Sequence, residues 1–145
     1  MQKTTIIKAA RTIGIWLPAI LLALIFVPQG WSKFNDASGW AVAFRHWGYP
    51  DWFRVTIGVM ELGGVALLLL GRSAALGAIL IIVVMLGGMA THIIFDGGRH
   101  LTSEVVPLVL ASIVLVLRRG QIRSLVDRLR RTAVAPSTAA RPPAF

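Results

Sequence analysis

Residues 73–95 read SAALGAILIIVVMLGGMATHIIF, and this stretch decides how the chain folds. It contains no lysine, arginine, aspartate or glutamate, and His92 is its only ionisable side chain. A helix rises about 1.5 Å per residue, so a stretch of this length crosses the roughly 30 Å hydrocarbon core of a membrane. A strand is excluded because lipid cannot satisfy an open sheet edge and the stretch lacks barrel-type alternation. It therefore predicts a transmembrane helix.

Three more apolar blocks flank this one, at about residues 12–30, 53–70 and 101–117. The chain is 56% hydrophobic and 14% charged, whereas soluble domains carry about 25% charged residues. We therefore predict an all-α fold, an integral membrane four-helix bundle, within residues 1–117. The first block could instead be a cleaved signal peptide, but its apolar stretch is long and no A-x-A site follows it.

The distribution of lysine and arginine predicts the orientation. With the N-terminus inside, the inner segments hold 11 of the 15 basic residues and the outer segments hold 4. The inner set is Lys3, Lys8, Arg11, Arg72, Arg118, Arg119, Arg123, Arg128, Arg130, Arg131 and Arg141, and the outer set is Lys33, Arg45, Arg54 and Arg99. The positive-inside rule then places both termini in the cytoplasm, with the chain in the cell (inner) membrane.

Residues 118–131 predict a basic amphipathic helix on the cytoplasmic side. Its apolar residues follow helical spacing at Ile122, Leu125, Val126 and Leu129. Its arginines are Arg119, Arg123, Arg128, Arg130 and Arg131. Such a helix directly after a span is typical of an anionic-lipid contact, although a protein partner stays open. We expect no nucleic-acid partner, because no recognition fold accompanies the charge. Residues 132–145, rich in alanine and proline, are predicted to be disordered.

The loop of residues 31–52 is predicted to lie outside, and it is rich in aromatic residues. It contains Trp31, Trp40, Trp47, Trp52 and the only tyrosine, Tyr49. A short helix would place Trp40, Phe44 and Trp47 on one face. Indole rings prefer the headgroup layer, so we favour an interfacial segment that lies flat on the outer leaflet. The alternative is an aromatic mouth for a substrate.

Three ionisable residues, Glu61, His92 and Lys33, are candidates for a buried polar cluster. An ionisable group near the membrane centre costs about 2.5–3.5 kcal/mol on insertion scales. Glu61 lies about 13 Å along a helix from Trp52, close to mid-membrane. If the helices close into a bundle, the three side chains could meet. Glu61 could form a structural ion pair or take a chemical role, His92 could pack or relay protons, and Lys33 could simply snorkel.

Arg54 and Glu104 are secondary candidates. Arg54 shares a helix face with Glu61, and Glu104 falls in the first turn of a helix, where the helix dipole favours a carboxylate. No metal site is predicted, because the chain has no cysteine and only one histidine within a span. No Ser-His-Asp arrangement or phosphate loop occurs, so catalytic residues stay unknown and enzyme activity stays uncertain.

Several short motifs resemble those of DoxX-type membrane proteins. Residues 30–33 (GWSK) resemble the family's G-x-x-K, residues 48–50 (GYP) its G-x-P, and residues 58–64 (GVMELGG) its G-x-x-E-x-x-G. Gly71-Arg72 resembles its turn, and Ala90-Thr91-His92 the end of its third span. The resemblance covers about residues 11–117 and implies a four-helix membrane fold. The family takes its name from a subunit of a thiosulfate:quinone oxidoreductase, and many of its members have no assigned activity. The cofactor therefore stays unknown, and the resemblance makes a quinone a candidate cofactor and redox proteins candidate partners.

We therefore hypothesise an accessory subunit of a membrane-associated redox system, which would be quinone-linked. One alternative is a non-enzymatic membrane scaffold or assembly factor. Another is a small-solute or proton transporter that titrates Glu61. The transporter ranks last, because a single four-helix unit lacks the internal repeat of many transporters.

Overall fold

The computed structural model describes the backbone of residues 2–134 and the side chains of residues 13, 14 and 16–132. Over that range the chain is helical, with no strand, which confirms the all-α prediction. The helices are α1 (Gln2–Ser32), α2 (Gly39–His46), α3 (Asp51–Leu69), α4 (Ala74–Asp96), α5 (Leu101–Leu117) and α6 (Arg119–Val134). The disorder predicted for residues 132–145 falls mostly outside the described residues, and α6 runs to Val134.

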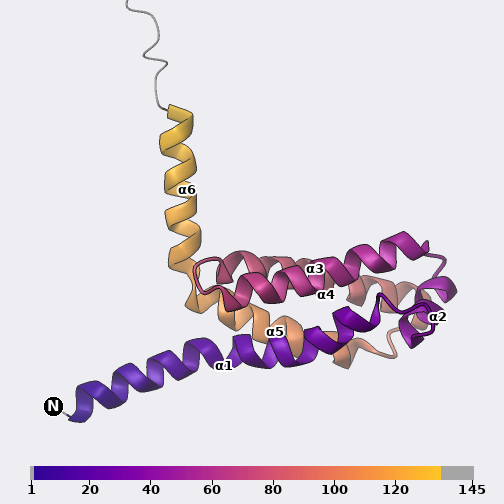
Figure 1. The fold of residues 1–145 in the computed structure, drawn as a ribbon, viewed down its shortest axis with the longest axis horizontal. Helices are drawn as coiled ribbons and strands as arrows, with labels where there is room; N and C mark the ends of the chain where they lie inside the picture. The colour runs from indigo at the N-terminus through magenta and orange to yellow at the C-terminus, as the bar shows by residue number, and fades with distance from the viewer. Residues whose placement is uncertain (1, 135–145) are drawn as a thin grey trace, which may run out of the picture.

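Four helices pack side by side, and the other two lie at opposite ends of them (Figure 1). Helix α1 contacts α3 and α5, while α4 contacts α3 and α5. We call these four helices, with α1 taken from Trp16, the helical body. Helix α2 lies against one end of the body, which we call the α2 end. Helix α6 crosses the other, which we call the α6 end.

Glycines at the connections let the chain reverse direction. The turn between α3 and α4 contains Gly71 at φ +66°, and α4 ends at Gly97 at φ +61°. Side chains are disfavoured at positive φ, whereas glycine adopts it without strain. Because both connections are short, α3, α4 and α5 follow one another as antiparallel neighbours.

Small residues also bring the helices of the body close together. A Cβ added at Gly77 of α4 would lie 2.5 Å from the carbonyl oxygen of Gly64 on α3. A Cβ at Gly58 of α3 would lie 3.0 Å from the carbonyl oxygen of Gly30 on α1. These two crossings place helix backbones in direct contact, as small residues do between membrane helices. Leu22, Phe26, Leu68, Ile81 and other apolar side chains fill the core between the helices.

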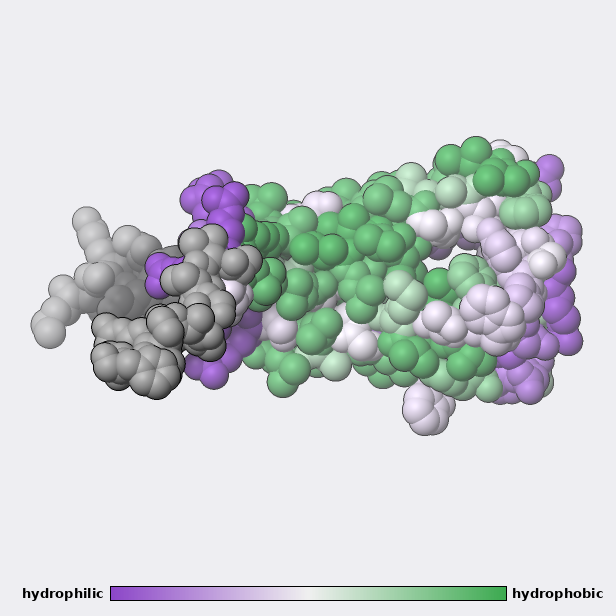
Figure 2. Space-filling model, turned by 90° about the horizontal axis from the view of Figure 1, so that it is seen from above, coloured by the Kyte–Doolittle hydropathy of each residue, from purple (hydrophilic) through white to green (hydrophobic). Residues whose placement is uncertain are grey.

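The outside of the body is apolar as well. Leu24, Val59 and Ile94 are among many large apolar side chains that are exposed. In Figure 2, green apolar atoms cover the middle of the molecule, and purple hydrophilic atoms gather towards its two ends. A soluble monomer rarely exposes such a continuous apolar surface, so the surroundings that suit this body are lipid.

Two helices, α3 and α4, are long and apolar enough to cross a membrane on their own. A third span is counted if α5 and α6, which are bent by 61° at their junction, are taken as one. The apolar part of α1, Trp16–Ser32, is a shorter apolar helix, and α5 alone has 17 residues. Helix α1 also begins at Gln2, well before the predicted span at 12–30.

Candidate functional site

Lys33 and Glu61 form a buried ion pair at the α2 end. The crossing of Gly30 with Gly58 brings the end of α1 against α3, and Glu61 follows Gly58 by one helical turn. The ammonium of Lys33 donates to both carboxylate oxygens of Glu61, at 2.8 and 3.0 Å. The two side chains are 2% and 3% exposed, so the charges are compensated by each other rather than by solvent.

Arg54 does not take part in that pair, although it shares a helix face with Glu61. Its guanidinium donates to the backbone carbonyl of Lys33 and pairs with the carboxylate of Asp36. Asp51, three residues earlier, is a more distant partner at 3.7 Å. Arg54 is therefore a positioning residue, because it holds the segment after α1 against α3 and keeps Lys33 in place.

His92 and Glu104 form a second polar group, contributed by α4 and α5. The Nδ1 of His92 lies 2.6 Å from a carboxylate oxygen of Asp96, one turn along α4. Its Nε2 lies 3.7 Å from Glu104 Oε1, beyond hydrogen-bond distance. Glu104 sits in the first turn of α5, as predicted, and its side chain packs over Gly88. Although Glu104 is only 7% exposed, its carboxylate forms no hydrogen bond with the residues that the structure describes.

The aromatic residues of the α2 segment cover these charges. The Lys33 ammonium lies 3.9 Å from the centre of the Trp40 ring, a favourable cation–π distance. Trp47 is 8% exposed, donates its indole N–H to Asp96 at 3.1 Å, and meets the His92 ring edge-on. Thr91 donates to the Gly87 carbonyl, so the Tyr49 hydroxyl is left to donate to Thr91, at 3.1 Å.

A cavity of about 330 Å³ separates the two polar groups. Its lining includes Lys33, Glu61, His92 and Glu104 among the charged residues, and Trp40, Phe44, Trp47 and Tyr49 among the aromatic ones. Met60 of α3 and the exposed Val83 and Gly87 of α4 also line it, which places an opening between these two helices. Figure 2, which looks onto the side of α3 and α4, shows a hollow near that end of the body. The cavity thus joins the apolar outer surface to buried charges.

The three residues predicted to form one cluster instead belong to two polar groups on the wall of the same cavity. Lys33 and Glu61 are in contact, while His92 lies with Glu104 on another part of the same cavity wall. The four predicted interfacial tryptophans separate into two kinds. Trp31 and Trp52 are 73% and 67% exposed, whereas Trp40 and Trp47 line the cavity.

Sequence reasoning missed Asp96, Tyr49 and Thr91 as members of the site. The spacing of His92 and Asp96, four residues apart on one helix, was an available signal. No such signal links Tyr49 to Thr91, because they meet only through the fold. Within the described part of the chain, no three histidine, aspartate or glutamate side chains are placed to hold a metal ion.

Comparison with known proteins identifies one family. Residues 17–116, more than two thirds of the chain, match the model of the DoxX-like family. No curated protein and no solved structure matches the chain significantly. The matched region includes every residue of the cavity wall and ends before α6.

Proposed function

The chain belongs to the DoxX-like family, and from that premise we propose that it is an accessory subunit of a membrane-associated redox system. In this proposal the cavity at the α2 end binds the polar head of a quinone-type molecule that moves within the membrane. The family and the apolar helices indicate a membrane protein. The redox role is supported by the polar groups and aromatic rings that line the cavity.

The proposed topology has four spans, formed by α1 from Trp16, α3, α4 and α5. Both termini would be cytoplasmic, in the cell inner membrane, because most lysines and arginines gather towards the termini and α6. The α2 end would then face the outside, with Trp31 and Trp52 at the headgroup level. The cavity would open between α3 and α4 towards the acyl chains of that half of the bilayer.

The observation that carries the proposal is a buried carboxylate facing a cavity without a protein hydrogen bond. Buried polar groups are nearly always hydrogen-bonded, because an unsatisfied neutral group costs about 1–3 kcal/mol. A charged group costs more. Glu104 and the Nε2 of His92 have no hydrogen-bond partner among the described residues. Their atoms are not sealed inside protein, since the fully buried unpaired side-chain atoms there are the Nε atoms of Arg54 and Arg118. Both residues line the cavity, so their polar atoms are open to whatever fills it. A ligand with matching polar atoms would satisfy them.

A quinone head fits the chemistry of this wall. With the Nδ1–H of His92 donating to Asp96, the Nε2 of a neutral ring accepts a hydrogen bond from a quinol hydroxyl. A protonated ring donates from Nε2 to a quinone carbonyl instead. The Lys33 ammonium, which bonds both oxygens of Glu61 and faces the Trp40 ring, adds positive charge to the same cavity wall. Aromatic walls suit a flat ring, and the opening between α3 and α4 would leave an isoprenoid tail in lipid.

The test is to purify the protein from native membranes in mild detergent and to identify extracted quinones by mass spectrometry. We expect a bound quinone in the natural protein, and a several-fold lower content in the double variant His92→Leu/Glu104→Gln. Trp52→Phe, which changes an exposed ring outside the cavity, is the matched control and should retain the quinone.

A folded protein that carries no quinone, together with unchanged membrane redox activity after gene deletion, would overturn the proposal. If Glu61→Gln then lowered only the abundance of the protein, and crosslinking recovered a stable partner, a scaffold would be the better description. Flux into liposomes that depends on Glu61 would instead favour a transporter.

A further inference from the structure

A second cavity, at the α6 end, lies between α6 and the start of α4. Its volume is about 450 Å³, within the range of small-ligand sites. Two arginines, Arg72 and Arg128, line it together with Ser73 and Ser124, whose hydroxyls donate to backbone carbonyls. Leu76 and Leu125 supply apolar wall. Among the residues that the structure describes, no acidic side chain lines this cavity, which we call the basic cleft.

The basic cleft is held open by contacts that fix the start of α6. The side-chain amide of Gln121 donates to the Gly71 carbonyl at 2.6 Å, and its oxygen accepts from the backbone N–H of Ala75 at 3.1 Å. Arg118 donates to the same Gly71 carbonyl at 3.3 Å. These bonds tie α6 to the turn between α3 and α4. The bend of 61° after α5 then carries α6 across the end of the body.

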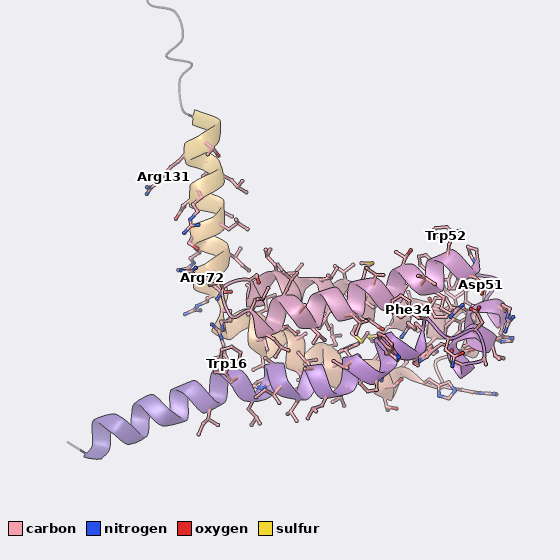
Figure 3. The ribbon with its side chains drawn as sticks, viewed as in Figure 1. Trp16, Phe34, Asp51, Trp52, Arg72 and Arg131 are labelled. Carbon is pink, nitrogen blue, oxygen red and sulfur yellow. The ribbon has the colours of Figure 1, made fainter. Side chains whose placement is uncertain are left out.

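The two faces of α6 differ in chemistry. In Figure 3 the labelled Arg131 of α6 points away from the helical body, whereas Arg128 lines the basic cleft between α6 and α4. Side chains that contain only carbon point towards the side on which the body lies. If the body spans a bilayer, α6 lies along the membrane surface with its apolar face towards the acyl chains.

We propose that the basic cleft binds the phosphate-bearing headgroup of an anionic phospholipid. Two guanidinium groups match phosphate oxygens, and among the described residues neither Arg72 nor Arg128 forms an ion pair. The apolar side chains of Leu76 and Leu125 continue from the cleft to the apolar surface of the body, so they suit the start of an acyl chain. This continuity favours a lipid over a soluble phosphate compound.

The site is independent of the proposed quinone cavity. It would instead fix how α6 lies on the membrane and set a preference for the lipids around the protein. A surface polybasic segment attracts anionic lipid through its total charge alone. The basic cleft differs from such a segment because particular arginines, rather than their number, decide the affinity.

The test uses the full chain in detergent, titrated with phosphatidylglycerol and read by native mass spectrometry. The charge-assisted hydrogen bonds to the phosphate are lost with the two guanidinium groups, so Arg72→Gln/Arg128→Gln should weaken binding of the first lipid roughly 30-fold. The matched control, Arg119→Gln/Arg131→Gln, removes the same amount of charge outside the cleft. Because these exposed charges act on the lipid only through a screened, long-range attraction, binding should weaken only about threefold. All four arginines are exposed or half-exposed, so folding should be retained.

Two further titrations decide the identity of the ligand. Phosphatidylcholine, which has a zwitterionic head, should bind the natural protein more weakly than phosphatidylglycerol does. Inorganic phosphate should not displace phosphatidylglycerol at millimolar concentration. If both double variants lost the same affinity for phosphatidylglycerol, binding would depend on total charge alone. If inorganic phosphate displaced the lipid, the cleft would be a site for soluble phosphates. Either result overturns the proposal.

Discussion

The contact between α3 and α4 is built on different physical principles at the two ends of the helical body. Towards the α6 end, α3 and α4 meet through Gly64 and Gly77 with no space between their backbones. Towards the α2 end, the same two helices separate around a cavity walled by Lys33, Glu61 and His92. The first arrangement relies on close contact between backbones, and the second relies on polar groups that satisfy one another.

This contrast separates stability from chemistry within one small fold. A close glycine crossing has no room for a ligand, and it provides a rigid base for the rest of the body. The opposite end contains buried charges whose removal from water is unfavourable unless they are paired. Such groups in a membrane protein usually mark function. Three sets of variants test whether the two ends differ in this way.

The largest effect is expected when the buried ion pair loses one member. Lys33→Met leaves the carboxylate of Glu61 buried without its partner, and breaking a buried pair in this way costs about 3–5 kcal/mol. The double variant Lys33→Met/Glu61→Met removes both charges and should recover most of that loss. The free energy of unfolding is measured by SDS titration in mixed micelles. A double-mutant cycle then compares this free energy among the natural protein, the two single variants and the double variant. A double variant no more stable than Lys33→Met would show that the two side chains act separately.

The next effect compares one glycine from each end. Gly77→Ala would place a methyl group 2.5 Å from a backbone oxygen of α3, which cannot move aside, so we expect a loss of about 2–3 kcal/mol. Gly88→Ala meets only the carboxylate of Glu104, at 3.0 Å, and that side chain can shift into the cavity. Its cost should stay below about 1 kcal/mol. Equal losses in the same unfolding assay would mean that the two ends are packed equally tightly.

The smallest effect tests a hydrogen bond at the α2 end. Tyr49→Phe removes the hydroxyl that donates to Thr91, and such a bond contributes about 1 kcal/mol. Thr56→Val is the control, because the exposed Thr56 hydroxyl bonds only the carbonyl one turn back in its own helix. It should change stability by less than about 0.5 kcal/mol. If Thr56→Val lowered stability as much as Tyr49→Phe does, the hydrogen bond between Tyr49 and Thr91 would have no particular stabilising role.

Much of the fold could be predicted from periodicity and length. The apolar blocks at 53–70, 73–95 and 101–117 correspond closely to α3, α4 and α5, because a long apolar run has few alternatives to a helix. The start of α1 at Gln2 was missed, because polar residues before an apolar block give no sign of whether the helix continues into them. The direction of α6 was also beyond sequence reasoning, since it depends on the bonds of Gln121 to the turn at Gly71.

The sequence predicted which residues belong to the candidate site better than it predicted which of them contact one another. Burial in an apolar chain makes Glu61, Lys33 and His92 stand out, since charges in lipid must find partners. Which partner each would find depends on contacts between different helices. Arg54 lies on the face of Glu61 yet bonds the carbonyl of Lys33, and Glu104 faces His92 across two helices.

Composition, spacing and local motifs are sufficient to show that the chain is helical, apolar on its outer surface and a member of the DoxX-like family. Only the tertiary structure decided that Lys33 rather than Arg54 pairs with Glu61, and that Trp40 and Trp47 wall a cavity. The physical reason is that helical spacing fixes which residues share a face. The glycine crossings between helices fix which faces meet.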